Sequence, residues 1–121
     1  MTAEMDIQNS IRLALAKKGH YVFRANVGKI RMPNGRIFDT GLPKGFPDLF
    51  GFRGTDGKMF FIEVKNEIGK LRQEQKNFQQ AMEMTPAICG VARSAEEALQ
   101  IVEGRDKNEK ISCYMWKSSR N

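Results

Sequence analysis

Two apolar runs and the polar turn between them, at residues 45–65, constrain the fold of this chain most strongly. The runs read GFPDLFGF and KMFFIEVK, and the joining segment Arg53–Gly57 ends in the Asp-Gly pair typical of tight hairpin turns. The pattern predicts two neighbouring antiparallel strands, around which the remaining elements must be arranged.

Charged side chains interrupt both predicted strands. Asp48 opens the first strand, and Glu63 and Lys65 lie near the end of the second. Because side chains alternate between the two faces of a strand, Glu63 and Lys65 share one face, together with Phe61. Asp48 precedes Glu63 by about the length of a hairpin, which places it on the neighbouring strand. We therefore expect two carboxylates and an ammonium group to converge at one end of a sheet.

These residue types favour metal-dependent hydrolysis. An acid and a lysine on a partly apolar face are costly to bury unless they pair with each other or bind a metal. Two carboxylates on rigid strands provide the hard oxygen ligands that Mg²⁺ or Mn²⁺ prefers, with positions left for water and phosphate. A neighbouring lysine can hold an attacking water or help to deprotonate it.

The size and charge of the chain indicate one domain with a polyanionic partner. Its 121 residues fit a single domain, 1–121, and carry a net charge of +6 with a pI near 9.6. This balance favours nucleic acid, although a basic protein with no special partner is the alternative. Cys89 and Cys113 lack metal-ligand spacing and favour a reducing compartment, while a disulfide between them is left open. No secretion signal or membrane-spanning apolar run is present, so we expect a cytoplasmic protein without a membrane partner.

The first predicted helix runs from Thr2, a possible cap, to about Lys18, with Gly19 as its stop. Glu4 falls on the apolar stripe of this helix, where an acid is unexpected for a purely structural helix. It either points over the sheet toward the predicted carboxylates or is simply an acid that the helix dipole favours. His20 has no cysteine or histidine partner in the sequence and is interpreted as structural.

Basic residues gather just before the carboxylates. A strand is predicted at Tyr21–Val27, and Lys29–Met32 and Arg36–Phe38 then flank Asn34-Gly35, a strong hairpin signal. We interpret this hairpin as a basic arm that contacts phosphates, and the alternative is a solvated edge hairpin that uses charge against aggregation. The predicted nucleic-acid-binding residues are Arg24, Lys29, Arg31, Arg36 and Lys44.

The second half of the chain predicts a helix at Leu71–Met84, a strand at Ala87–Ala92, a short helix capped by Ser94 and a last strand at Ile111–Trp116. Gln75 lies inside the apolar stripe of the longer helix, and a buried amide needs hydrogen-bond partners. It either reaches a water or phosphate in the predicted site or is a satisfied interior glutamine.

The order of these features resembles the PD-(D/E)xK nuclease superfamily, and in detail its VRR-NUC branch, the virus-type replication-repair nucleases. The motifs that carry the resemblance are the loop GLPKGFPDL with Asp48, the strand FIEVK with Glu63 and Lys65, and Gln75-x-x-Phe78. The resemblance implies an α/β fold with a restriction-endonuclease-like core, a central mixed β-sheet flanked by helices. The implied order is αβββαβ, with an extra β-arm and a short C-terminal helix and strand.

The resemblance also implies a metal site. Asp48 and Glu63 would bind a divalent cation, Mg²⁺ or Mn²⁺, together with the backbone carbonyl of Val64. Glu4 matches the acid of the family's first helix and would contact the metal directly or through water.

The reaction that the resemblance implies is in-line hydrolysis of a phosphodiester, which leaves a 5′-phosphate. Lys65 would orient the attacking water and stabilise charge on the phosphoryl group, and Gln75 would hold the nucleophile or Lys65. The implied catalytic residues are therefore Asp48, Glu63, Lys65 and Gln75.

Members of this branch that stand alone look like homodimeric Holliday-junction resolvases, and we expect this chain to have no appended domain. The resemblance therefore implies a homodimer acting on branched or duplex DNA, at the nucleoid or in a phage-infected host cell. The predicted strand Ile111–Trp116 is one candidate for the dimer interface. The alternatives are a flap, nick or sequence-specific endonuclease, and a non-catalytic DNA-binding module whose acids are structural.

Overall fold

The computed structural model describes residues 2–104, and its elements alternate as the sequence predicts. The predicted α/β class, with its order αβββαβ, its arm and its short late helix, is confirmed. The predicted last strand, Ile111–Trp116, and its suggested role in a dimer lie outside the described residues. The elements are α1 (Glu4–Lys17), β1 (Tyr21–Arg24), β2 (Lys29–Arg31), β3 (Ile37–Asp39), β4 (Leu49–Phe52), β5 (Met59–Val64), α2 (Gln73–Met82), β6 (Ile88–Ala92) and α3 (Ala95–Glu103).

Four strands form a mixed sheet in the order β1-β4-β5-β6. The predicted hairpin is present: β4 and β5 pair antiparallel, with Leu49 opposite Ile62, and the turn closes through Arg53 N donating to Lys58 O at 2.9 Å. Gly57 has a φ of 77°, which the Asp-Gly turn requires. β6 pairs parallel to β5, so α2 forms the crossover that a parallel pair needs.

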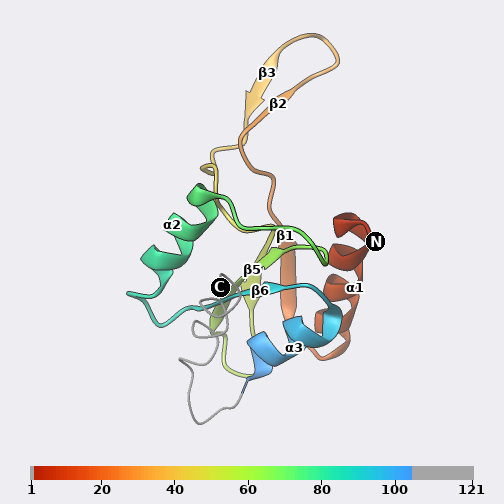
Figure 1. Ribbon diagram of the computed structural model, residues 1–121, viewed down its shortest axis with the longest axis vertical. Coiled ribbons are helices and arrows are strands. Elements are labelled where there is room, and N and C mark those ends of the chain that lie inside the picture. The colour runs from red at the N-terminus through yellow and green to blue at the C-terminus, as the bar shows by residue number, and fades with distance from the viewer. Residues whose placement is uncertain (1, 105–121) are drawn as a thin grey trace.

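One face of the sheet packs against α1 and α3 and holds the main core (Figure 1). The even-numbered residues of β5 point to this face, where Ile62 is fully buried. Gly90 allows α3 to approach β6, because a Cβ there would lie 2.7 Å from the side chain of Ile101. The core residues are Ile7, Ile11, Leu15, Leu49, Phe60, Ile62, Val64, Ile88, Ala92, Ala98, Ile101 and Val102.

The opposite face of the sheet packs against α2 and is smaller and more aromatic (Figure 1). Each of the rings of Phe46, Phe61 and Phe78 packs against the other two, with centroids 5.3–5.8 Å apart. The predicted helix Leu71–Met84 is shorter than expected, because Arg72 is its extended N-cap and Leu71 joins the cluster from the preceding segment. Gln75 and Gln79 are buried on the side of α2 that faces the sheet, while Ala81 is exposed.

One of the two predicted helix caps is present and the other is not. Thr2 does not cap α1: Ala3 is the N-cap, and Thr2 N donates instead to Glu67 Oε1 at 3.2 Å. Ser94 caps α3 as predicted, accepting a 3.1 Å hydrogen bond from Glu97 N. The carboxylate of Glu97 accepts a 2.7 Å hydrogen bond from Arg93 N, the residue before this cap.

The chain leaves the sheet earlier than predicted to form the arm. β1 ends at Arg24 rather than at Val27, and β2 and β3 pair in a separate two-stranded sheet. This arm projects beyond the end of the main sheet at which α1 and α2 begin (Figure 1).

His20 has the structural role expected of it. Its buried ring accepts a hydrogen bond from Gly54 N at Nδ1 and bonds Glu103 through Nε2 at 2.9 Å, joining α1, the hairpin and α3. Within residues 2–104, no helix is both long enough and apolar enough to cross a bilayer.

Candidate active site

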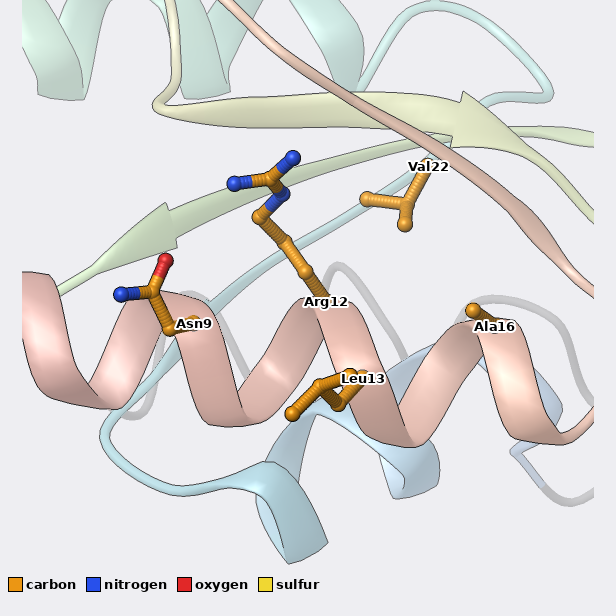
Figure 2. A pocket seen from close by; sticks show the side chains of 5 residues that line it. All are labelled: Asn9, Arg12, Leu13, Ala16 and Val22. Atoms are coloured by element: carbon orange, nitrogen blue, oxygen red, sulfur yellow. The ribbon is translucent and has the colours of Figure 1, made fainter.

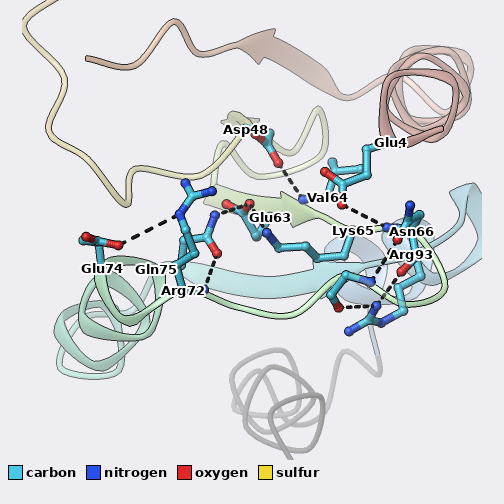
Figure 3. Close-up of polar contacts among 11 residues, drawn as sticks. Glu4, Asp48, Glu63, Val64, Lys65, Asn66, Arg72, Glu74, Gln75 and Arg93 are labelled. Atoms are coloured by element: carbon cyan, nitrogen blue, oxygen red, sulfur yellow. Dashed lines mark hydrogen bonds and ion pairs between the residues drawn. The ribbon is translucent and has the colours of Figure 1, made fainter. Parts of the chain in front are cut away.

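Asp48 is held at the start of β4 by backbone on both sides. Its Oδ2 accepts a 2.8 Å hydrogen bond from Val64 N on β5, and its carbonyl oxygen accepts from Ala25 N beyond β1 at 2.9 Å. Pro47 before it is fully buried, which fixes the entry of the chain into the strand. The half-buried carboxylate of Asp48 therefore lies beside the end of β5 (Figure 3).

Glu63 and Lys65 share the α2 side of β5, as their alternation predicts. The Glu63 side chain is buried, and its Oε2 lies 3.6 Å from Lys65 Nζ. Lys65 is also buried, with a relative exposure of 6%. Two ionisable groups this far from water are stable only when further polar contacts or a change of protonation state satisfies them.

Gln75 supplies one of those contacts, and both ends of its side-chain amide are hydrogen-bonded. Its Nε2 donates a 2.7 Å hydrogen bond to Glu63 Oε2, and its Oε1 accepts a 2.8 Å bond from Arg72 N (Figure 3). Because a backbone N–H can only donate, the amide oxygen must face Arg72 and the amide nitrogen must face the carboxylate. Gln75 thus caps α2 and orients Glu63 with the same side chain.

The surroundings of Glu63 oppose its negative charge. Burial raises the pKa of Glu63 to about 9, and the negative charge of Asp48 adds to the rise, while Lys65 and Arg72 act in the opposite direction. Two carboxylates at close quarters in a low dielectric cannot both ionise cheaply without added positive charge. The site is therefore suited to a cation.

The donor atoms of the site also fit a divalent metal. Glu63 Oε1 is buried and makes no hydrogen bond with any described residue, which leaves one acidic oxygen beside Asp48 without a partner. Carboxylate oxygens are the ligands that Mg²⁺ and Mn²⁺ prefer. Among residues 2–104, no three acidic, histidine or cysteine side chains gather closely enough to form a metal-binding group. The side-chain ligands brought together are thus the two carboxylates.

Glu4 lies apart from these two carboxylates. It is exposed in the first turn of α1, and its Oε2 accepts a 3.4 Å hydrogen bond from Asn66 N, one residue beyond Lys65 (Figure 3). A Cβ at Gly69 would come within 2.8 Å of the same oxygen. The predicted contact of Glu4 with a metal stays a prediction.

Sequence reasoning missed the residues that hold the segment after Lys65. Arg93 Nη1 donates to the carbonyl oxygens of Asn66 at 2.5 Å and Gly69 at 2.9 Å, and Asn66 Oδ1 accepts from Gly69 N at 2.9 Å. The Asn-x-x-Gly spacing is a turn signal that could have indicated the contact between Asn66 and Gly69. Nothing in the sequence around Arg93 pairs it with a loop 24 residues earlier.

All five basic residues predicted to contact nucleic acid are exposed. Arg24 lies at the end of β1, and Lys44 lies in the loop that leads to Asp48. The other three, Lys29, Arg31 and Arg36, belong to the arm.

A groove between α1 and β1 contains none of these residues. It is lined by Asn9, Arg12, Leu13, Ala16 and Val22, from the outer side of α1 and the edge strand of the sheet (Figure 2). The site lies instead at the start of β4 and the end of β5, beside the first turn of α2.

A mixed sheet that carries an aspartate, a glutamate and a lysine at one end defines the class of PD-(D/E)xK nucleases. Residues 29–96 match the sequence profile of the VRR-NUC domain, and this match covers more than half of the 121 residues. The chain therefore belongs to the VRR-NUC family of nucleases. The matched range contains Asp48, Glu63, Lys65 and Gln75 but not Glu4.

A solved structure described as "VRR_NUC domain" shares the fold. It is 22% identical, the comparison covers 86% of this chain and 98% of that chain, and the TM-score is 0.62. At this level of identity the likeness concerns the fold alone. A comparison with curated protein sequences gave no match.

Proposed function

We propose that this chain is a divalent-metal-dependent, structure-specific DNA endonuclease that resolves Holliday junctions as a homodimer. The observation that supports metal dependence most directly is the buried Glu63 Oε1, which no described residue bonds, beside the carboxylate of Asp48. Because Asp48 and Glu63 are positioned by backbone and by Gln75, the site is rigid before any ligand arrives.

The residues that would hold the metal are Asp48 and Glu63, with the carbonyl of Val64 as a further ligand. When bound, the cation would polarise the phosphate and lower the pKa of a coordinated water. Gln75 acts through Glu63 and is a positioning residue, because its amide nitrogen fixes one carboxylate oxygen. The other oxygen is then left to face Asp48.

Lys65 is the residue that we expect to contact the reacting phosphate. Its ammonium group lies 3.6 Å from Glu63 Oε2 on a buried strand, so it can move toward a phosphoryl oxygen without leaving the site. A fixed positive charge in a site shielded from water stabilises the extra negative charge of the transition state. The exposed cations of the arm and the loop would bind flanking phosphates and position the duplex.

A substrate panel tests the preference for junctions. The purified chain is incubated with four-way junctions, flaps, nicked duplexes and linear duplexes of shared sequence, with and without Mg²⁺. We expect paired cuts across the four-way junction and little cutting of linear DNA. Preferred cutting of flaps or nicks would make those structures, and not the junction, the preferred substrate. Cutting at one sequence in linear DNA would indicate a sequence-specific enzyme.

The dimer is tested separately. A two-fold junction needs two cuts, and a two-fold dimer supplies two sites with matched geometry. Sedimentation of the chain alone and on a junction should give the mass of two copies. A single copy bound to each junction would refute the homodimer but not the nuclease chemistry.

A further inference from the structure

The arm carries two chemically different faces. Antiparallel pairing places Ile30 opposite Phe38 and Arg31 opposite Ile37. Directly opposed residues lie on the same side of a ribbon, and consecutive residues alternate. Ile30 and Phe38 therefore share one face, and Met32, whose N–H donates to Arg36 O at 2.7 Å, extends it toward the tip.

This apolar face is open to solvent. Ile30, Met32 and Phe38 have relative exposures of 42%, 42% and 56%, and they belong to neither apolar cluster of the fold. Three neighbouring apolar side chains on a thin projecting ribbon contribute nothing to the core. An exposed group of this kind commonly marks a binding surface.

The base of the arm is tied to the segment that leads into the candidate site. Thr40 donates to Gly28 O through both its N–H and its hydroxyl, each at 2.9 Å, and Gly28 N donates to Leu42 O at 3.2 Å. The same segment continues to Asp48. The arm therefore leaves the main sheet at the end where the carboxylates of Asp48 and Glu63 lie (Figure 1).

Charge indicates which partner the apolar face meets. The opposite face carries Lys29 and Arg31 together with Ile37 and Asp39, and Arg36 lies near the tip opposite Met32. The one acid of the arm, Asp39, lies at its base and accepts a 2.9 Å hydrogen bond from Gly41 N. A basic ribbon is complementary to DNA, and a second copy of a chain with a net charge of +6 would repel it.

We propose that the apolar face of the arm, Ile30, Met32 and Phe38, packs against bases exposed at the branch point of the DNA, while the cations contact the adjoining phosphates. This inference rests on the proposed function, since it assigns the preference for branched DNA to the arm. Apolar wedges enter between bases only where stacking is interrupted or can be broken. Bases that are already unpaired or unstacked remove most of that cost, so the arm distinguishes a branch from a continuous duplex.

A binding comparison with matched variants tests this assignment. Ile30→Thr/Phe38→Thr removes the apolar face and keeps residues that favour strands, and Ile37→Thr makes the same kind of change on the opposite face. Affinities for a four-way junction and for linear duplex are measured in EDTA, so the result does not depend on cleavage. A 2-aminopurine base at the branch point reports unstacking by its fluorescence.

The double variant should bind the junction about tenfold more weakly, lose the 2-aminopurine signal and keep its affinity for linear duplex. Ile37→Thr should behave as the wild type. Equal weakening on both DNAs, no change on either, or a changed sedimentation mass with an unchanged junction preference would each overturn the proposal. Absence of metal-dependent cleavage by the wild type would instead overturn the proposed function and leave this binding result standing.

Discussion

Gln75 Nε2 donates a 2.7 Å hydrogen bond to Glu63 Oε2, and no other side-chain amide in the described residues bonds that carboxylate. The opposite end of the same amide accepts from Arg72 N, so the start of α2 is coupled to the acid at the end of β5. This relationship connects helix capping to the geometry of the candidate metal site.

Replacing Gln75 should therefore impair the site more than the fold. We expect Gln75→Leu to lower metal-dependent cleavage by about 10–100-fold, the usual effect of losing a partner of a metal ligand. Its matched control is Gln79→Leu, one helical turn further, where the buried amide makes no hydrogen bond with any described residue. That variant should keep full activity and gain about 1–3 kcal/mol in free energy of unfolding. Equal activity losses in the two variants would mean that Gln75 acts only through the stability of α2.

The raised pKa of Glu63 predicts how stability depends on pH without metal. The pKa is about 9 in the folded chain and 4.5 in the unfolded one, so the folded state binds the extra proton between these values. The free energy of unfolding should consequently fall as pH rises from about 5 to 9. Glu63→Gln has no such proton to lose and should be the more stable protein at pH 8.5 in EDTA, by an amount on the order of a few kcal/mol.

Urea denaturation of both proteins at pH 5.5 and pH 8.5 in EDTA measures this difference. Mg²⁺ should then stabilise the wild type and leave Glu63→Gln almost unchanged, because binding to the folded state alone raises stability. The contrary outcome is that Glu63→Gln is less stable than the wild type at both pH values, or differs from it by the same free energy of unfolding at both. Either result would argue against a raised pKa of Glu63.

Lys65→Ala should separate binding from cleavage. The side chain is buried beside Glu63 and contributes little surface to a bound duplex, so junction affinity in EDTA should change by less than about threefold. Cleavage should fall by about 10²–10³-fold, because a fixed charge at the reacting phosphate is lost. Lys70→Ala removes an exposed lysine five residues later and serves as the control. Retained turnover by Lys65→Ala would remove this residue from the proposed mechanism.

The arm should set part of the salt dependence of DNA binding. Each phosphate contact contributes about 0.9 to the slope of log affinity against log salt concentration. Lys29→Gln/Arg31→Gln should therefore flatten the slope, whereas Lys17→Gln/Lys18→Gln, at the far end of α1, should leave it unchanged. The slopes are obtained by titrating a labelled duplex at four salt concentrations. Identical slopes for the two double variants would place the arm outside the interface.

Sequence spacing predicted which candidate residues lie close together where neighbouring strands determine it. Residues two apart on a strand share a face, and a short turn determines which residues of a hairpin meet, so the proximity of Asp48 to Glu63 and Lys65 followed from spacing. Gln75 could be predicted to lie on the sheet side of α2 from helical periodicity. Its simultaneous bond to Arg72 could not, because the cap of a helix depends on where the preceding segment turns.

Contacts between distant segments were the part that spacing did not reveal. Glu4 was expected on the stripe that faces the sheet, but its carboxylate contacts Asn66, because the position of α1 depends on the packing of its whole apolar face. Thr2 has a residue type that favours helix caps, and it binds Glu67 instead. The role of Arg93 depends on the parallel crossover from β5 to β6, which no local pattern encodes.

The central claim is that Asp48 and Glu63 hold a divalent cation that is required for DNA cleavage. Asp48→Asn tests it most directly, because an amide oxygen can still accept from Val64 N while the charge of the ligand is removed. On a four-way junction, the wild type should cleave with Mg²⁺ and not with EDTA, and Asp48→Asn should bind the junction but lose at least about 10²-fold in cleavage rate. Cleavage by Asp48→Asn at the wild-type rate, or cleavage by the wild type in EDTA, would contradict the account.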